Sequence, residues 1–203
     1  MSETSNAKPA RGRPRDPDLE NRVFDAVMQI YADGGWSAFT FEAVARLSGV
    51  GKSSLYRRWD SQQTLLRAAM KARWLPVHNI DTGSLPGDLR ELAQLIFDNR
   101  TGEYANMSNW LLIDAARFPE VQEMSSPYMQ ETVLQARAIV RRAAARGEVP
   151  TTQNHGLLMD LVVGAVNNHV MTTPPQLRAE MLRKAPGFLD NLVKIVLRGV
   201  EVR

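Results

Sequence analysis

Residues 21–59, NRVFDAVMQIYADGGWSAFTFEAVARLSGVGKSSLYRRW, decide the fold of this chain. An amphipathic helix is followed here by two short helical segments, which are joined by Ser48-Gly49-Val50. Gly49 suits the connection because a tight turn between helices usually contains a residue at positive φ, which glycine adopts without steric cost. The pattern predicts a helix-turn-helix. Its small apolar core is expected to contain Val44, Leu47, Val50, Leu55 and Trp59.

The second helix of this motif presents basic and hydroxyl side chains. Between Ala43 and Trp59 the chain has four basic residues and no acidic one, so this face suits a polyanion such as duplex DNA. The N-terminal turn of such a helix meets base edges, whereas phosphate contacts position the protein. The predicted base-reading residues are Lys52, Ser53 and Ser54, and the predicted phosphate contacts are Thr40, Tyr56 and Arg57.

Residues 1–15 are rich in proline, alanine and arginine and lack an apolar period, which predicts a disordered basic arm. The arm contains Arg11-Gly12-Arg13-Pro14, the core of an AT-hook, in which arginines enter narrow electronegative minor grooves. The alternative is a tail that only improves solubility. Because the arm directly precedes a helix-turn-helix, Arg11, Arg13 and Arg15 are predicted to contact DNA.

The region resembles the DNA-binding signature of the TetR-type bacterial transcriptional regulators. The matching residues, in order and spacing, are Gly35, Thr40, Val44-Ala45, Ser48-Gly49-Val50, Leu55-Tyr56, Trp59 and Leu65. The resemblance implies a three-helix head that reads DNA and a helical domain that binds an effector and dimerises. It also implies two heads on a palindromic operator and an effector that moves the fourth helix. Gln62 departs from the pattern, because many members have a phosphate-binding lysine there.

The remainder of the chain has the pattern of an all-α protein. The segments with helical character are 86–100, 104–117, 119–146, 153–171 and 176–199. Pro127 and Pro186-Gly187 are expected to kink or divide two of them. The predicted domains are a helix-turn-helix domain over residues 16–60 and a ligand-binding and dimerisation domain over residues 61–203.

Two C-terminal segments, Leu157–Val166 and Phe188–Val200, are apolar around more of the helix than the stripe of an ordinary surface helix. One explanation is that both lie deep in the core of one subunit. The explanation that we favour is that each packs on its own subunit with one face and on a second copy with the other. A homodimer with a four-helix interface accounts for both segments.

Aromatic and methionine side chains are dense between residues 70 and 129, and most are expected to form the core. The same residue types line apolar ligand pockets between bundle helices. Asn167 and His169 lie near the end of an apolar helix, where they are either structural or in contact with a ligand. The residues predicted to contact a largely apolar small molecule are Met70, Trp74, Phe97, Tyr104, Met107, Trp110, Phe118, Met124, Tyr128, Asn167 and His169.

Several classes of protein are disfavoured by the composition. No stretch reaches the ~18 consecutive apolar residues of a membrane span and the start of the chain has no apolar signal segment, so a cytoplasmic protein is expected. The absence of cysteine removes disulfides and cysteine-ligated zinc. The three histidines lie in no metal-binding motif and no G-x-S-x-G occurs, so no metal, cofactor or enzymatic activity is expected.

The sequence therefore predicts a sequence-specific DNA-binding regulator. Its expected mode of action is that of a repressor, which a largely apolar small molecule releases from a palindromic operator. The alternative is a constitutive or architectural DNA-binding protein without an effector. Effector-dependent loss of operator binding separates the two.

Overall fold

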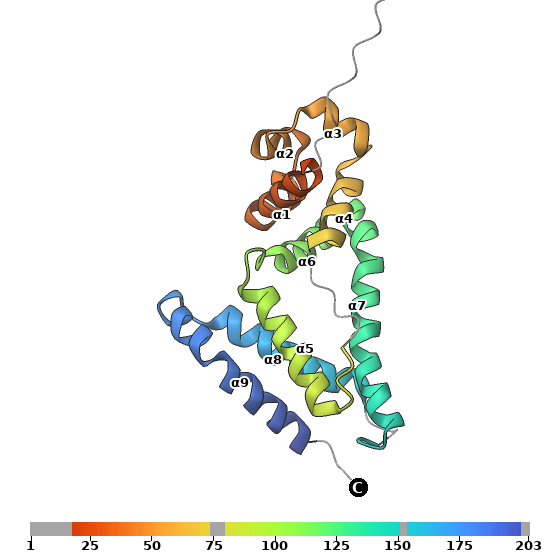
Figure 1. The fold of residues 1–203 in the computed structure, drawn as a ribbon, viewed down its shortest axis with the longest axis vertical. Coiled ribbons are helices and arrows are strands. Elements are labelled where there is room, and N and C mark those ends of the chain that lie inside the picture. The colour runs from red at the N-terminus through yellow and green to blue at the C-terminus, as the bar shows by residue number, and fades with distance from the viewer. Residues whose placement is uncertain (1–17, 74–79, 151–153, 200–203) are drawn as a thin grey trace, which may run out of the picture.

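The computed structural model describes residues 18–73, 80–150 and 154–199, and within them all regular structure is helical, as the sequence predicted. Figure 1 shows an elongated molecule with α1, α2 and α3 at one end and the C-terminal end of α9 at the other. The helices are α1 (Leu19–Ala38), α2 (Phe41–Ser48), α3 (Lys52–Arg58), α4 (Gln62–Arg73), α5 (Leu85–Thr101), α6 (Met107–Arg117), α7 (Pro119–Ala145), α8 (His155–Thr172), the 3-10 turn η1 (Pro175–Leu177) and α9 (Arg178–Arg198).

The helix-turn-helix is formed by α2 and α3. Thr40 begins α2, since its hydroxyl accepts a hydrogen bond from the Ala43 amide at 3.1 Å. Gly49 ends α2 with a φ of 68°, in the left-handed conformation that the turn was expected to need. The side chains of Val44, Val50, Leu55 and Trp59 are all buried, as predicted.

The prediction for Leu47 was wrong, because its side chain is 49% exposed. The buried face of α2 is centred between Phe41, Val44 and Ser48. At 3.6 residues per turn, Leu47 lies roughly 90° away from the centre of that face. The residue type was apolar, but its position on the helix faces outward.

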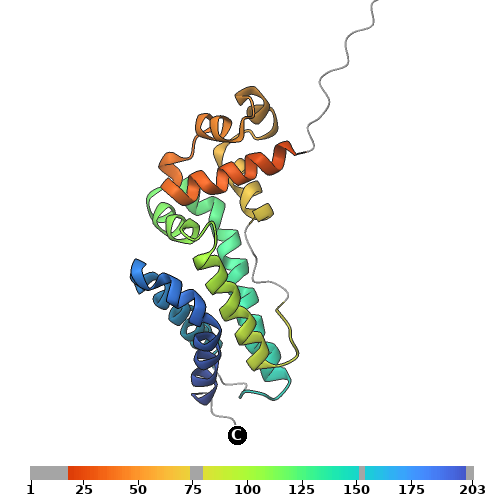
Figure 2. The ribbon, with the colours of Figure 1, turned by 60° about the vertical axis from the view of Figure 1, so that its left-hand side comes forward.

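Buried side chains form two clusters. The first, called the head core below, joins α1, α2 and α3 to α4, α6 and the start of α7. To this core α4 contributes Leu65, Leu66, Ala69 and Met70. The other, called the second core below, joins α5, the C-terminal half of α7, α8 and α9. Figure 2 shows α7 running alongside both parts, so this helix belongs to the head core at its start and to the second core at its end.

The C-terminal end of α1 is hydrogen-bonded to α6 at a kink in α1. Gly35 has a φ of 64°, and the amide of the next residue, Trp36, donates to Asp114 Oδ2 at 2.7 Å. The Asp114 carboxyl is almost fully buried. Trp110 donates from its indole nitrogen to the Ala32 carbonyl at 3.1 Å, which adds a second bond between α6 and α1.

The expected interruptions at the two internal prolines do not divide the helices. α7 continues from Pro119 to Ala145 through Pro127, and α9 continues through Pro186. Near Pro127 the hydroxyls of Ser125 and Ser126 donate to the carbonyls four residues earlier, at 2.7 and 2.6 Å. These bonds lie in the turn before Pro127, where side-chain hydroxyls often accompany a bend in a helix.

The contact between Gly35 and α6 predicts a difference between two glycines with positive φ. A Cβ at Gly35 would lie 2.6 Å from Trp110 and 2.8 Å from Asp114, whereas a Cβ at Gly49 would meet nothing within 4 Å. We expect Gly49→Ala to lower the free energy of unfolding by about 1 kcal/mol through backbone strain, and Gly35→Ala by about 2–4 kcal/mol through strain and overpacking. Urea unfolding of both variants at one protein concentration measures this difference. Equal losses would contradict a tight α1–α6 contact.

Candidate functional site

The predicted DNA face is exposed along α3. The side chains of Lys52, Ser53, Tyr56 and Arg57 are exposed, and that of Ser54 is half-buried. Leu55 points the other way and is completely buried. The helix thus keeps its polar and basic residues free on one side while its apolar side packs on the head.

Tyr56 is held in a defined orientation by α2. Its ring stacks on the buried ring of Phe41, with centroids 4.4 Å apart and an angle of 21° between the planes. The side chain is nevertheless 51% exposed. The stacking fixes the ring, and such a fixed hydroxyl can meet a phosphate with little loss of side-chain entropy.

Lys52 has an acidic partner that was not predicted from the sequence. Its ammonium group forms an ion pair with Glu42 and lies 5.9 Å from the centre of the Tyr56 ring. Glu42 immediately precedes the acid-free stretch, and the turn brings the first turn of α2 close to the first turn of α3. The free protein therefore already compensates part of the charge at the start of α3.

Two further predicted positions have structural partners. The Thr40 hydroxyl caps α2 and is partly buried, although its hydrogen can still be donated to a phosphate. The Gln62 side chain donates to the Phe39 carbonyl at 2.6 Å, which ties the start of α4 to the loop before α2. Arg11, Arg13 and Arg15 lie outside the described residues.

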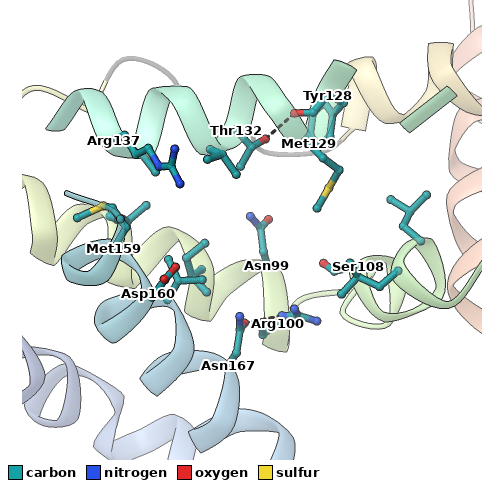
Figure 3. Close-up of a pocket in the computed structure, with 18 residues that line it drawn as sticks. Asn99, Arg100, Ser108, Tyr128, Met129, Thr132, Arg137, Met159, Asp160 and Asn167 are labelled. Carbon is teal, nitrogen blue, oxygen red and sulfur yellow. Dashed lines mark hydrogen bonds between the residues drawn. The ribbon is translucent and has the colours of Figure 1, made fainter. Parts of the chain in front are cut away.

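A cavity of about 360 Å³ lies between α5, α6, α7 and α8. This volume is within the range of small-molecule sites. Figure 3 shows its walls, with Met129 and Asn99 directed into the space between the helices. Leu112, Met129 and Val133 line it and are 58%, 39% and 44% exposed, so the cavity offers apolar surface that the described part of the chain leaves uncovered.

Arg100 is the central polar group of this cavity. Its Nε donates to Asn167 Oδ1 at 2.8 Å, and its Nη1 donates to Asn109 Oδ1 at 2.6 Å. It thereby links α5 to α8 and α6. Burial lowers the pKa of this guanidinium below its ordinary value, and burial also raises the pKa of Tyr128 on the opposite wall.

The predicted ligand residues are distributed over several places. Tyr128 and Asn167 line the cavity. His169 lies apart, stacked on Phe188 between α8 and α9 with ring centroids 3.9 Å apart. Phe97 is in the second core, and Trp74 lies outside the described residues. The remaining six belong to the head core or pack against it: Met70, Tyr104, Met107, Trp110, Phe118 and Met124.

Most of the residues that line the cavity were not predicted from the sequence. On α7 they recur at the spacing of one helix face, in the set Tyr128, Met129, Thr132, Val133, Ala136 and Arg137. Such a stripe was visible in the sequence, yet it does not by itself distinguish a cavity wall from a core face. Asn99 and Arg100 gave no signal at all, because polar residues on a helix usually face solvent.

A separate apolar stripe follows the outer face of α8. Leu157, Leu161 and Met171 are exposed on α8 by 50–60%, at helical spacing, and Leu182 and Ile195 are exposed on α9. The residues that point inward from the same helices are buried, among them Val162 and Val196. None of the described helices is both long and apolar enough to cross a membrane.

Comparisons with known proteins identify both parts of the chain. Residues 23–69 match the model of the tetR family of bacterial regulatory proteins, and residues 79–186 match the tetracyclin repressor-like C-terminal domain. The HTH-type transcriptional regulator AqdR of Rhodococcus erythropolis is 28% identical over 163 residues, which cover 79% of this chain and 78% of AqdR. An uncharacterized HTH-type transcriptional regulator of Mycobacterium tuberculosis is 27% identical over 75% of this chain and 78% of its own length.

Solved structures share the fold. FadR of Bacillus subtilis, determined in complex with stearoyl-CoA, aligns with a TM-score of 0.67 at 12% identity over 89% of this chain and 99% of FadR. GusR of Salmonella enterica aligns with a TM-score of 0.64 at 17% identity, over 91% of this chain and 98% of GusR. With its helix-turn-helix head and its matching C-terminal domain, this chain belongs to the TetR family of DNA-binding transcriptional regulators.

Proposed function

We propose that this regulator is a dimeric repressor that leaves a palindromic operator when a largely apolar small molecule enters the cavity between α5, α6, α7 and α8. The observation that carries the proposal is the uncovered apolar wall of that cavity, formed by Leu112, Met129 and Val133. A closed protein core would bury these side chains. FadR, a transcriptional regulator that shares the fold, was determined in complex with stearoyl-CoA, which is consistent with a C-terminal domain that accepts an apolar ligand.

The effector signal reaches the head through α6. Ser108, Leu111 and Leu112 of α6 line the cavity, and the same helix is bonded to α1 through Trp110 and Asp114. A ligand that shifts α6 therefore acts directly on α1, which packs on α4. The shift requires that the ligand bind one arrangement of these helices more tightly than the other.

The alternative function is a constitutive or architectural DNA-binding protein without an effector. Operator fragments selected from the source genome, followed by titration with a panel of amphipathic small molecules, decide between the two. Loss of operator binding with at least one compound supports the repressor. Operator binding that no compound changes, in a protein whose cavity binds none of them, supports the alternative.

The DNA surface consists of α3 and the residue before α2. We expect Tyr56→Phe and Arg57→Gln to weaken binding to operator and random duplex alike, because they remove phosphate contacts. Ser54→Ala should change the preferred base, because each base contact contributes ~1–3 kcal/mol of discrimination. Tyr56→Phe keeps the ring that stacks on Phe41, so the weaker binding reports the hydroxyl alone.

Fluorescence anisotropy with both duplexes measures these effects. Arg141→Gln is the control. It removes one positive charge, as Arg57→Gln does, but at an exposed position near the C-terminal end of α7. Unchanged affinities in all three α3 variants would show that this face of α3 does not bind DNA.

The basic arm adds contacts in the neighbouring minor groove through Arg11, Arg13 and Arg15. We expect a chain that lacks residues 1–15 to fold normally and to bind operator more weakly. Its plot of log affinity against log salt should be shallower by about 0.9 for each phosphate that the arm would otherwise neutralise. A slope equal to that of the full chain would reduce the arm to a solubilising tail.

The exposed apolar stripe of α8 and the exposed Ile195 of α9 belong to the dimer interface. Ile195 and Val196 are neighbours on α9, but their exposed fractions are 67% and 7%. We expect Ile195→Glu to give a folded monomer whose operator affinity falls by about tenfold or more, since one head then binds one half-site. Val196→Glu buries an unpaired charge and should unfold the chain.

Light scattering and circular dichroism distinguish these outcomes. A third variant, Val162→Glu, should behave like Val196→Glu, because Val162 is completely buried on α8. An Ile195→Glu protein that remains a dimer would contradict the interface.

A further inference from the structure

Arg100 has only neutral partners among the residues that the structure describes. Its two hydrogen bonds go to the side-chain amide oxygens of Asn109 and Asn167. A guanidinium has five N–H donors, so three of them are left without a partner in the described part of the chain. The group is half-buried, and burial opposes its charge.

Three other arginines, whose side chains are 25–30% exposed, have carboxylate partners. Arg73 pairs with Asp25 at 2.6 Å, and Arg90 pairs with Asp190 at 2.6 Å. Arg146 contacts Asp88 at 3.3 Å. Those arginines fasten helices or loops together, as structural ion pairs do. Arg100 differs in two respects. No carboxylate pairs with it in the described part of the chain, and its side chain lines a cavity.

The charges that line the cavity leave it electropositive. They are Arg100, Arg137 and Asp160, and neither Arg137 nor Asp160 has an ion pair within residues 18–73, 80–150 and 154–199. Arg137 and Asp160 are exposed to solvent, whereas Arg100 is half-buried between α5, α6 and α8. Figure 3 shows Arg100 and its partner Asn167 at the side of the cavity opposite α7.

We propose that the effector is an amphipathic anion, with an apolar body on the α7 wall and a carboxylate or similar anionic group bound by Arg100. The inference rests on the proposed function, because it assumes that the cavity holds the effector. A planar guanidinium with free donors matches a carboxylate through two parallel hydrogen bonds. Asn99, which points into the cavity, supplies an amide donor from the same helix.

The same group connects recognition to α6. Arg100 Nη1 is bonded to Asn109, which directly precedes Trp110, and Trp110 is bonded to the Ala32 carbonyl of α1. An anion that draws the guanidinium toward the cavity competes with the Asn109 bond. Binding of the anionic group thereby acts on the helix that carries the signal to the head.

The test compares acids with neutral molecules of the same body. The probes are decanoate with 1-decanol and 2-naphthoate with 2-naphthol, at pH 7.5, and calorimetry gives the dissociation constants. We expect the wild-type protein to bind each acid about tenfold more tightly than its neutral partner, as a charge-assisted bidentate pair would give. Arg100→Gln should remove that preference and leave the affinity for the neutral molecules within about twofold.

Two further variants make the result specific. Arg100→Lys keeps the charge but loses the bidentate geometry, so it should retain part of the preference. Arg141→Gln removes an exposed charge outside the cavity and should change nothing. Circular dichroism of each variant verifies folding.

Each remaining outcome overturns a different claim. A wild-type protein that binds acids and neutral molecules equally overturns the anionic effector and leaves the apolar cavity intact. A preference for acids that survives in Arg100→Gln overturns the role of Arg100. Failure of all four compounds to bind overturns the proposed ligand cavity, and the anionic effector with it.

Discussion

The hydrogen bond from the Trp36 amide to the buried carboxyl of Asp114 joins α1 of the head to α6, and the packing of the head on the rest of the protein depends on it. It accepts a hydrogen bond from the Trp36 amide at 2.7 Å, at the point where Gly35 kinks α1. A polar group at this depth is stable only when it is hydrogen-bonded, so the carboxyl and the freed amide require each other. Tyr31 lies beside the same carboxyl, and its pKa is raised mainly by burial and further by Asp114.

This arrangement connects the head to the C-terminal domain through α6. One side of α6 supplies Met107 and Leu111 to the head core, and Ser108, Leu111 and Leu112 also border the cavity. One face of α6 is therefore fixed by close packing in the head core, whereas another face borders the cavity. Movement imposed at the cavity face must be accommodated at the head face, because packed cores deform little.

The head could be predicted from the sequence because its determinants are local. Thr40 caps the helix that begins one residue later, and Gly49 turns the chain within three residues. The core of the head followed from apolar spacing, with Leu47 as the exception. The family of the chain followed from the same stretch, and its all-helical class followed from the helical patterns of the later segments. These features depend on neighbours in sequence and hardly on the remainder of the molecule.

The cavity could not be predicted in the same way. Counting aromatic and methionine residues measures how apolar a segment is, but it does not tell which face of each helix meets another helix. Most residues chosen by that criterion pack in the head core, whereas the cavity walls come from four helices brought together by long-range packing. Arg100 and Asn167 are 67 positions apart along the chain, so no local pattern connects them.

The ion pair between Lys52 and Glu42 gives the free head a property of its own. In the proposed complex, a DNA group at Lys52 would either displace Glu42 or use the ammonium donors that Glu42 leaves free. Random duplex offers mainly phosphate charge in return, whereas a matching site adds base contacts that compensate for the broken pair. Because both side chains of the pair are largely exposed, breaking it in the proposed complex would cost less than about 1 kcal/mol, so Glu42 would slightly lower the affinity for DNA of any sequence.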